Sequence, residues 1–348
     1  MTTTSAEKKK DISLELIRIF TAFFIIFHHT GTEGFILFSR YEVGSLQYWL
    51  YRPWFAFCCF DVPMFFTISG ITLLKKQEPL KVLFRKRILR SFIVLVLVSV
   101  IYYVKDVLSF PQISFMDIVI TFFKNFFCGA ISGHLHFMYK YLVFLIALPF
   151  LRKIAQNISR QELHYMLIVA FAVQFFAPMF AKLLSDGGSL QSDVSYLNII
   201  FITYPFLGYY LYYVFDFSKI KTKHIIGMVL CSVVLLFLSC FPHKYFPPQE
   251  SFTWVYVATV FIVIKYYFSN IKNTFAQKII LSFGKCTFSV YLFHMLVMHS
   301  SWGETIENFL ISHISPLTAI LLFCLLTLIV SVLITLVLKK IPLLDKLL

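Results

Sequence analysis

Apolar runs of about 20 residues recur along the whole of this 348-residue sequence and are separated by short polar segments. A helical run of this length crosses the ~30 Å hydrocarbon core of a bilayer. With 59% apolar and only 14% charged residues, the composition excludes an ordinary soluble domain, in which about a quarter of residues are charged. The sequence therefore predicts an all-α membrane protein, a polytopic bundle of about ten transmembrane helices forming a single domain over residues 1–348.

Windows of about 20 residues define the ten predicted spans. They lie near 12–31, 53–74, 90–108, 134–151, 163–183, 195–215, 224–241, 252–268, 284–300 and 316–338. A further apolar piece, 115–131, is interrupted by Lys124-Asn125 and is expected to form an interfacial or re-entrant helix. No cleavage site of small residues follows the first apolar run, so that run is expected to be an uncleaved span and not a signal peptide.

The distribution of basic residues predicts the topology. If the N-terminus is cytoplasmic, inner segments hold 23 of the 31 Lys and Arg residues and outer loops hold six, as the positive-inside rule requires. The formal net charge of +14 is therefore mostly a topology signal, and we expect two cytoplasmic termini and no nucleic-acid partner. The seven cysteines form no CxxC pair, which favours buried apolar roles and predicts no metal site.

The first span contains four ionisable residues, Glu15, Arg18, His28 and His29. Such groups are costly inside a bilayer and indicate function, although Arg18 could instead extend to the inner interface and the histidines could cap the outer end. Eleven residues separate Arg18 from His29, which places them within about 20° of one helix face and ~16 Å apart along the axis. Glu15 precedes Arg18 by three residues and can pair with it.

A strongly basic run follows the second span, with seven Lys and Arg residues over 75–90 against the single acid Glu78. A solvated inner loop would explain this run without any ligand. Arg87 and Arg90, however, are three residues apart, so on a helix they share a face and can bind phosphates. The run therefore also predicts a site for a cytoplasmic, nucleotide-like anion.

Further polar side chains are predicted in other spans, namely Asp61 in the second, His134 and Lys140 in the fourth and His294 in the ninth. A lone histidine in a span is often a packing or hydrogen-bonding residue. Asp61 and His134 are nevertheless expected in the same outer half as His28 and His29, which favours a common site.

Several of these stretches, in the same order, resemble the membrane proteins of acyltransferase family 3. The likeness lies in an arginine and a histidine separated by ten residues, VPMFFTISGITLL, Arg87-Ile-Leu-Arg90, GHLHFMYKYLVFLIALPF and SVYLFH, and it extends over nearly the whole chain. Two positions depart from the family pattern. Glu15 stands where the family usually has Asp, which keeps the charge, and His136 stands where it often has Trp, so stacking there is in doubt.

The resemblance implies transfer of an acyl group, usually acetyl, from cytoplasmic acyl-CoA to a hydroxyl of a cell-envelope polysaccharide or its lipid-linked precursor. It implies His29 as general base or, alternatively, as an acylated intermediate, with Arg18 and Glu15 completing the catalytic set. Arg87 and Arg90 would bind CoA, while Asp61, His134 and Lys140 would orient the acceptor or stabilise the oxyanion. No permanently bound cofactor is expected, and the protein would lie in the bacterial inner membrane as a multi-pass protein.

Two other functions remain open from the sequence. Intramembrane Arg, His, Asp and Lys also suit an exporter of a polysaccharide precursor, although no repeat relates the two halves of the chain. A purely structural membrane partner is the third alternative. The sequence leaves the acyl group, the acceptor and the oligomeric state undetermined.

Overall fold

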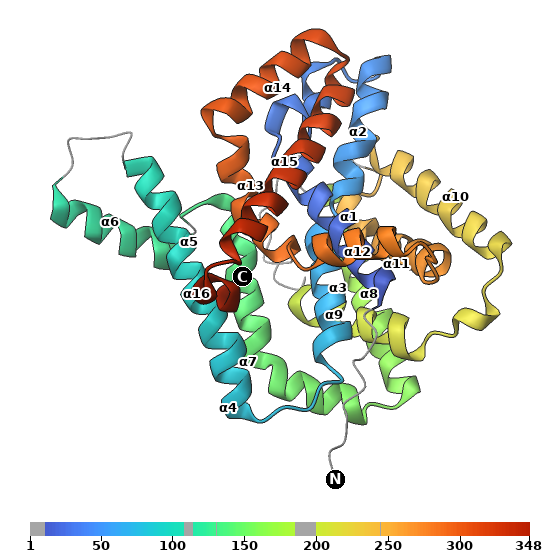
Figure 1. Cartoon of the computed structure of the whole chain (residues 1–348). Coiled ribbons are helices and arrows are strands. Elements are labelled where there is room, and N and C mark those ends of the chain that lie inside the picture. Colours follow the sequence, from blue (N-terminus) through green and yellow to red (C-terminus); the bar gives the residue numbers. More distant parts are fainter. Residues whose placement is uncertain (1–10, 108–113, 130, 185–199, 244) are drawn as a thin grey trace.

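The structure is a computed structural model that describes residues 11–107, 114–129, 131–184, 200–243 and 245–348. Every regular element in these ranges is helical (Figure 1), which confirms an all-α polytopic membrane protein. The α-helices are α1 Ile12–His28, α2 Leu46–Cys58, α3 Asp61–Leu73, α4 Leu80–Leu83, α5 Leu89–Val107, α6 Phe115–Cys128, α7 His136–Asn157, α8 Arg160–Leu184, α9 Ile200–Tyr209, α10 Thr222–Ser239, α11 Thr253–Phe268, α12 Thr274–Gly284, α13 Thr287–Met298, α14 Ser301–His313, α15 Pro316–Leu338 and α16 Pro342–Leu347.

Seven helical segments of the described chain are long and apolar enough to cross a membrane, and an eighth is obtained if α12 and α13, bent by 66°, form one span. The helix α1 has only 17 residues, fewer than the ~20 of a typical span. Of the helix formed by α9 and its continuation η6 Tyr210–Val214, the described part covers residues 200–214. Residues 195–199 of the predicted sixth span lie outside the described residues. The count of ten and the side on which each terminus lies stay predictions.

Two helical segments differ in extent from the predicted spans. The segment that contains the predicted span 53–74 begins at Leu46, because α2 continues almost directly into α3. Its first turns contain Gln47 and Arg52, whose polar groups lower the local hydropathy and conceal the helix. The predicted span 284–300 corresponds to α13 alone, and the helix before it, α12, was not predicted.

The apolar piece predicted near 115–131 forms the separate helix α6, which projects from the bundle in Figure 1. Its 14 residues are too few to span a bilayer, and Phe126 is its one buried residue. Its placement at the membrane interface stays a prediction.

The helix α1 is central and packs against α3, α11, α12, α13 and α15. Close packing of α3 on α9 depends on two glycines, because a Cβ on Gly70 would lie 2.0 Å from the Pro205 carbonyl oxygen and one on Gly208 would lie 2.0 Å from that of Thr67. Small residues of this kind allow membrane helices to approach with their backbones in contact. The approach fixes α3, which lines the cavity described below.

The bundle has two chemically different ends. The end that holds Lys75–Arg90 is called the basic end, and the end that holds His28 and His29 is called the histidine end. At the basic end, a wider π-helical turn, η3 Phe84–Ile88, joins α4 to α5. Such turns are rare in helices and occur frequently at functional sites.

Candidate active site

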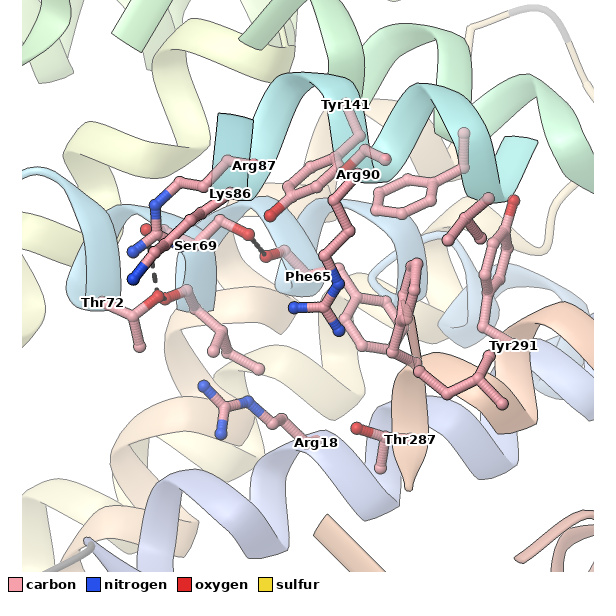
Figure 2. Close-up of a pocket in the computed structure, with 16 residues that line it drawn as sticks. Arg18, Phe65, Ser69, Thr72, Lys86, Arg87, Arg90, Tyr141, Thr287 and Tyr291 are labelled. Atoms are coloured by element: carbon pink, nitrogen blue, oxygen red, sulfur yellow. Dashed lines mark hydrogen bonds between the residues drawn. The ribbon is translucent and has the colours of Figure 1, made fainter. Parts of the chain in front are cut away.

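A cavity of about 280 Å³ lies among α1, α3, η3, α5, α7 and α13. We call it the cationic cavity, because Arg18, Lys86, Arg87 and Arg90 line one part of it. Figure 2 shows Arg18, Lys86 and Arg87 on the left of the view, Arg90 near its middle and Tyr291 on the right. The remaining lining residues are Phe65, Ile68, Ser69, Thr72, Ser91, Val94, Phe137, Tyr141, Thr287, Phe288 and Leu348.

Arg18 reaches the cavity from α1 and is paired with Glu15, as the spacing predicts. Its Nη1 donates to Glu15 Oε1 over 2.5 Å. The other carboxylate oxygen, Oε2, is buried and has no hydrogen-bond partner among the described residues. Gly284 makes room for this carboxylate, since a Cβ there would lie 2.3 Å from Oε2. The pair therefore holds the Arg18 side chain while one guanidinium edge stays available to the cavity.

Arg87 and Arg90 both line the cavity, but each has a protein partner that the spacing did not predict. Arg87 donates Nε and Nη2 to the two carboxylate oxygens of Glu78, at 2.7 and 3.3 Å. Arg90 donates Nε and Nη2 to the carbonyl oxygen of Leu347, at 3.2 and 3.1 Å. A phosphate bound here would therefore meet one arginine held by a carboxylate and one held only by a neutral carbonyl.

Glu78 organises the loop between α3 and α4. It also accepts from Arg152 Nη2 over 2.8 Å, while Lys76 lies 3.7 Å away. Burial of the carboxyl raises its pKa, but the hydrogen bonds and charges of Arg87 and Arg152 outweigh this and lower the pKa to about 2. Neither Glu78 nor Arg152 was predicted as a site residue, although Glu78 is the single acid in the basic run.

We expect Glu78→Gln to lower the thermal unfolding temperature of the purified protein by several degrees at pH 7. The pKa of the native carboxyl lies below its ordinary value near 4.5, so the ionised form stabilises the folded protein at pH 7. That contribution is complete above the ordinary pKa and is lost as the pH falls toward about 2. In thermal scans between pH 7 and 3, the unfolding temperature of wild type should therefore fall below pH 4.5, and that of the variant should not show this fall. Glu42→Gln, at an exposed carboxyl, is the control, and equal unfolding temperatures for Glu78→Gln and wild type at pH 7 would contradict the role.

Three histidines from different elements come together at the histidine end. The ring centroid of His29 lies 5.1 Å from that of His294 and 6.1 Å from that of His134, and the latter two are 5.3 Å apart. We call these three residues the histidine cluster. His29 follows α1, His134 lies in the short helix η4 Gly133–Leu135 and His294 lies in α13. His294 was not among the predicted site residues, since a lone histidine in a span is often a packing or hydrogen-bonding residue, and the SVYLFH stretch was the signal for its place here.

Two nitrogen atoms in this cluster are buried without a hydrogen bond to the described residues, Nε2 of His134 and Nε2 of His294. The Nδ1 atom of His294 lies 2.8 Å from the carbonyl oxygen of Tyr291 and 3.2 Å from that of Val290. Because carbonyls only accept, Nδ1 carries the proton in the neutral ring and Nε2 is a free acceptor. Unsatisfied buried groups of this kind are rare and often belong to functional sites. No three His, Cys, Asp or Glu side chains in the described ranges are placed to hold a metal ion.

A second polar pair lies beside the histidine cluster. His28 Nδ1 is 2.8 Å from Asp61 Oδ2, while Asp61 Oδ1 accepts from the Val62 backbone N–H. The aspartate side chain is only 3% exposed, whereas the imidazole is 39% exposed and stacks on Phe35 with ring centroids 4.1 Å apart. Asp61 therefore orients His28 and not His29. In the neutral imidazole this hydrogen bond makes Nδ1 the donor and leaves Nε2 as an acceptor.

Aromatic side chains connect the cationic cavity to the histidine cluster. The rings of Phe65, Phe137, Phe288 and Tyr291 also line the cavity, and we call these four rings the aromatic layer. Tyr291 connects this layer to the cluster, because its hydroxyl donates to the His134 carbonyl oxygen over 2.6 Å. The cavity lining includes Tyr291 but not His29, so it extends from the basic end to the edge of the cluster and stops there.

Lys140, predicted near a developing oxyanion, lies exposed on α7 and does not line the cationic cavity. A second cavity, of about 520 Å³, lies among α1, α2, α10 and α11 and is lined almost wholly by apolar side chains. It contains none of the predicted site residues. The structure thus brings the predicted residues, other than Lys140, into two adjoining groups.

Comparison with known families matches residues 11–336, nearly the whole chain, to a family described as an acyltransferase domain, acyltransferase family 3. Comparisons with curated proteins and with solved structures find no match. The matched range contains Arg18, Arg87 and Arg90 as well as all three members of the histidine cluster.

Proposed function

The chain belongs to acyltransferase family 3 and is a multi-pass membrane acyltransferase, and from this premise we propose its donor and its acceptor. The donor is cytoplasmic acyl-CoA, with acetyl as the acyl group. The acceptor is a hydroxyl of a cell-envelope polysaccharide or of its lipid-linked precursor, and the protein acts in the bacterial inner membrane. The observation that carries this proposal is one cavity that has arginines at the basic end and stops beside three histidines.

The cationic cavity supports binding of the phosphate groups of CoA. Under the positive-inside rule the basic end faces the cytoplasm, where acyl-CoA is made. Arginine guanidinium groups bind phosphate oxygens through paired, charge-assisted hydrogen bonds. Arg90 would exchange the neutral carbonyl of Leu347 for a phosphate oxygen, whereas Arg87 would contribute its charge while it remains bonded to Glu78.

The histidine cluster supports proton transfer from the acceptor. In the proposed step the acceptor hydroxyl oxygen attacks the thioester carbonyl, and His29 removes the hydroxyl proton. The tetrahedral intermediate then collapses, the carbon–sulfur bond breaks, and the sulfur of CoA leaves with that proton. His29 is the partly exposed member of the cluster, while His134 and His294 are buried beside it. The half-exposed His28, oriented by Asp61, would bind the incoming hydroxyl.

Mass spectrometry of surface glycans from cells with and without the gene tests this function. We expect a mass increment of ~42 Da on a glycan only when the gene is expressed, because an acetyl ester replaces one hydrogen by C2H3O. Other acyl groups would give other increments. Inverted membrane vesicles supplied with isotope-labelled acetyl-CoA should place the label in the same glycan. Two results would contradict the proposal. In cells without the gene, the glycan could fail to be exported while no acyl ester was missing from it. In vesicles that contain the protein, the glycan could remain unlabelled.

A further inference from the structure

The aromatic layer stands where an acyl group would have to pass from the cationic cavity to the histidine cluster. Phe137 lies at its centre, with ring centroids 5.2 Å from Tyr291 and 5.9 Å from Phe65. It also stacks on Tyr141 at 5.7 Å. Because α7 begins at His136, Phe137 lies one turn from His134. Its ring packs against Tyr291, whose own ring centroid lies 5.8 Å from that of His134.

The two rings of the closest pair are held differently. The Tyr291 hydroxyl is anchored to the His134 carbonyl, and the side chain is 4% exposed. Phe137 is only partly buried, carries no polar group, and makes its ring contacts with other aromatic side chains. Tyr291 is therefore the fixed member of the aromatic layer, and Phe137 is the member whose side chain can turn or be displaced.

We propose that Phe137 sets the upper limit on the length of the acyl group that the enzyme transfers. This inference rests on the proposed function, because it assumes that an acyl thioester enters the cationic cavity. A two-carbon acyl group needs little space beside the rings, whereas each further methylene must displace Phe137 into a packed aromatic neighbourhood. Extra methylenes in a packed site are disfavoured, and a difference of one methylene between two substrates changes the ratio of their kcat/KM values about 10-fold or more.

The test compares donors of two, four and six carbons in inverted membrane vesicles that contain the natural acceptor. Isotope-labelled acetyl-, butyryl- and hexanoyl-CoA are supplied to wild type and to Phe137→Ala, and the acyl ester on the glycan fraction is measured by mass spectrometry. We expect the ratio of hexanoyl to acetyl transfer to rise about 10-fold or more in Phe137→Ala. Phe137→Leu, which keeps more of the core volume, should give a smaller rise in the same direction and covers the case in which the alanine variant does not fold.

Phe144→Ala is the matched control, because Phe144 lies two turns further along α7, is fully buried, and does not line the cavity. It should keep the wild-type ratio. An unchanged ratio in both Phe137 variants, with acetyl transfer retained, overturns the inference and leaves the proposed function intact. A wild-type protein that transfers no acyl group of any length would instead overturn the proposed function.

Discussion

Replacing His29 with alanine is expected to lower acyl transfer by a factor of about 10²–10⁴, the range that a positioned general base contributes. The variant retains the arginines that line the cationic cavity, so donor binding should persist while the acceptor hydroxyl keeps its proton. The measurement is the initial rate of label transfer from acetyl-CoA to the glycan fraction of vesicles that hold equal amounts of enzyme. A fall in the maximal rate with little change in the KM for acetyl-CoA is the expected pattern.

His136→Ala provides the control, because His136 is exposed and lies at the start of α7, near the histidine cluster but outside it. Its rate should stay within about twofold of wild type, as for most surface substitutions. Comparable losses in both variants would mean that general damage to this end of the bundle, and not loss of the base, explains the result. Label on the wild-type protein in the absence of acceptor would favour an acylated His29 over a base.

Arg90→Ala is expected to raise the KM for acetyl-CoA about 10- to 100-fold and to change the maximal rate less. A charge-assisted hydrogen bond contributes about 1.5–3 kcal/mol, which corresponds to this range. Arg90→Lys should recover only part of the affinity, because an ammonium group lacks the paired donors of a guanidinium. Vesicle assays over a range of acetyl-CoA concentrations separate the two kinetic constants.

Arg85→Ala is the matched control for Arg90, since Arg85 is exposed in the same basic run and does not line the cationic cavity. Its KM should stay close to wild type. If both variants raised the KM equally, the basic run would attract the donor only through its summed charge, and added salt would then reduce the affinity for both alike. Because Arg90 also bonds to Leu347, the unfolding temperature of each variant is measured alongside its kinetics.

The helices of this protein were predictable because a bilayer leaves few alternatives for an apolar run of about 20 residues. Helix periodicity also predicted the Glu15–Arg18 pair, since residues three apart are neighbours on a helix. The hydropathy reading failed where polar side chains lie inside a helix, as at Arg52 in α2. There the guanidinium is covered by the rings of Phe38 and Phe55 and bonds to Gln249, and a hydropathy window detects neither the contact with Phe38 nor the bond to Gln249.

The assembled site depends on contacts between distant parts of the chain, which spacing alone does not specify. The histidine cluster joins residues 29, 134 and 294, and each histidine taken alone was equally consistent with a packing role. Likewise, the helical spacing placed Arg87 and Arg90 near one anion, but it did not predict that Glu78 already holds Arg87. Lys140 shows the opposite case, because its charge suggested the site and its exposed position on α7 separates it from the cavity.

The π-helical turn at Phe84–Ile88 makes the basic run sensitive to the deletion of a single residue. A π turn holds one more residue than the α-helical turn that could replace it, and each residue of an α-helix advances the chain by about 100°. Deleting a single residue here would restore a regular helix and rotate the preceding loop by that angle relative to α5. The Glu78–Arg87 pair would then no longer lie on the same side of the helix as Arg90, although every charge in the run remained. One surplus residue thus allows a single basic segment to do two things at once, because Arg87 fastens the loop through Glu78 while Arg90 lines the cationic cavity.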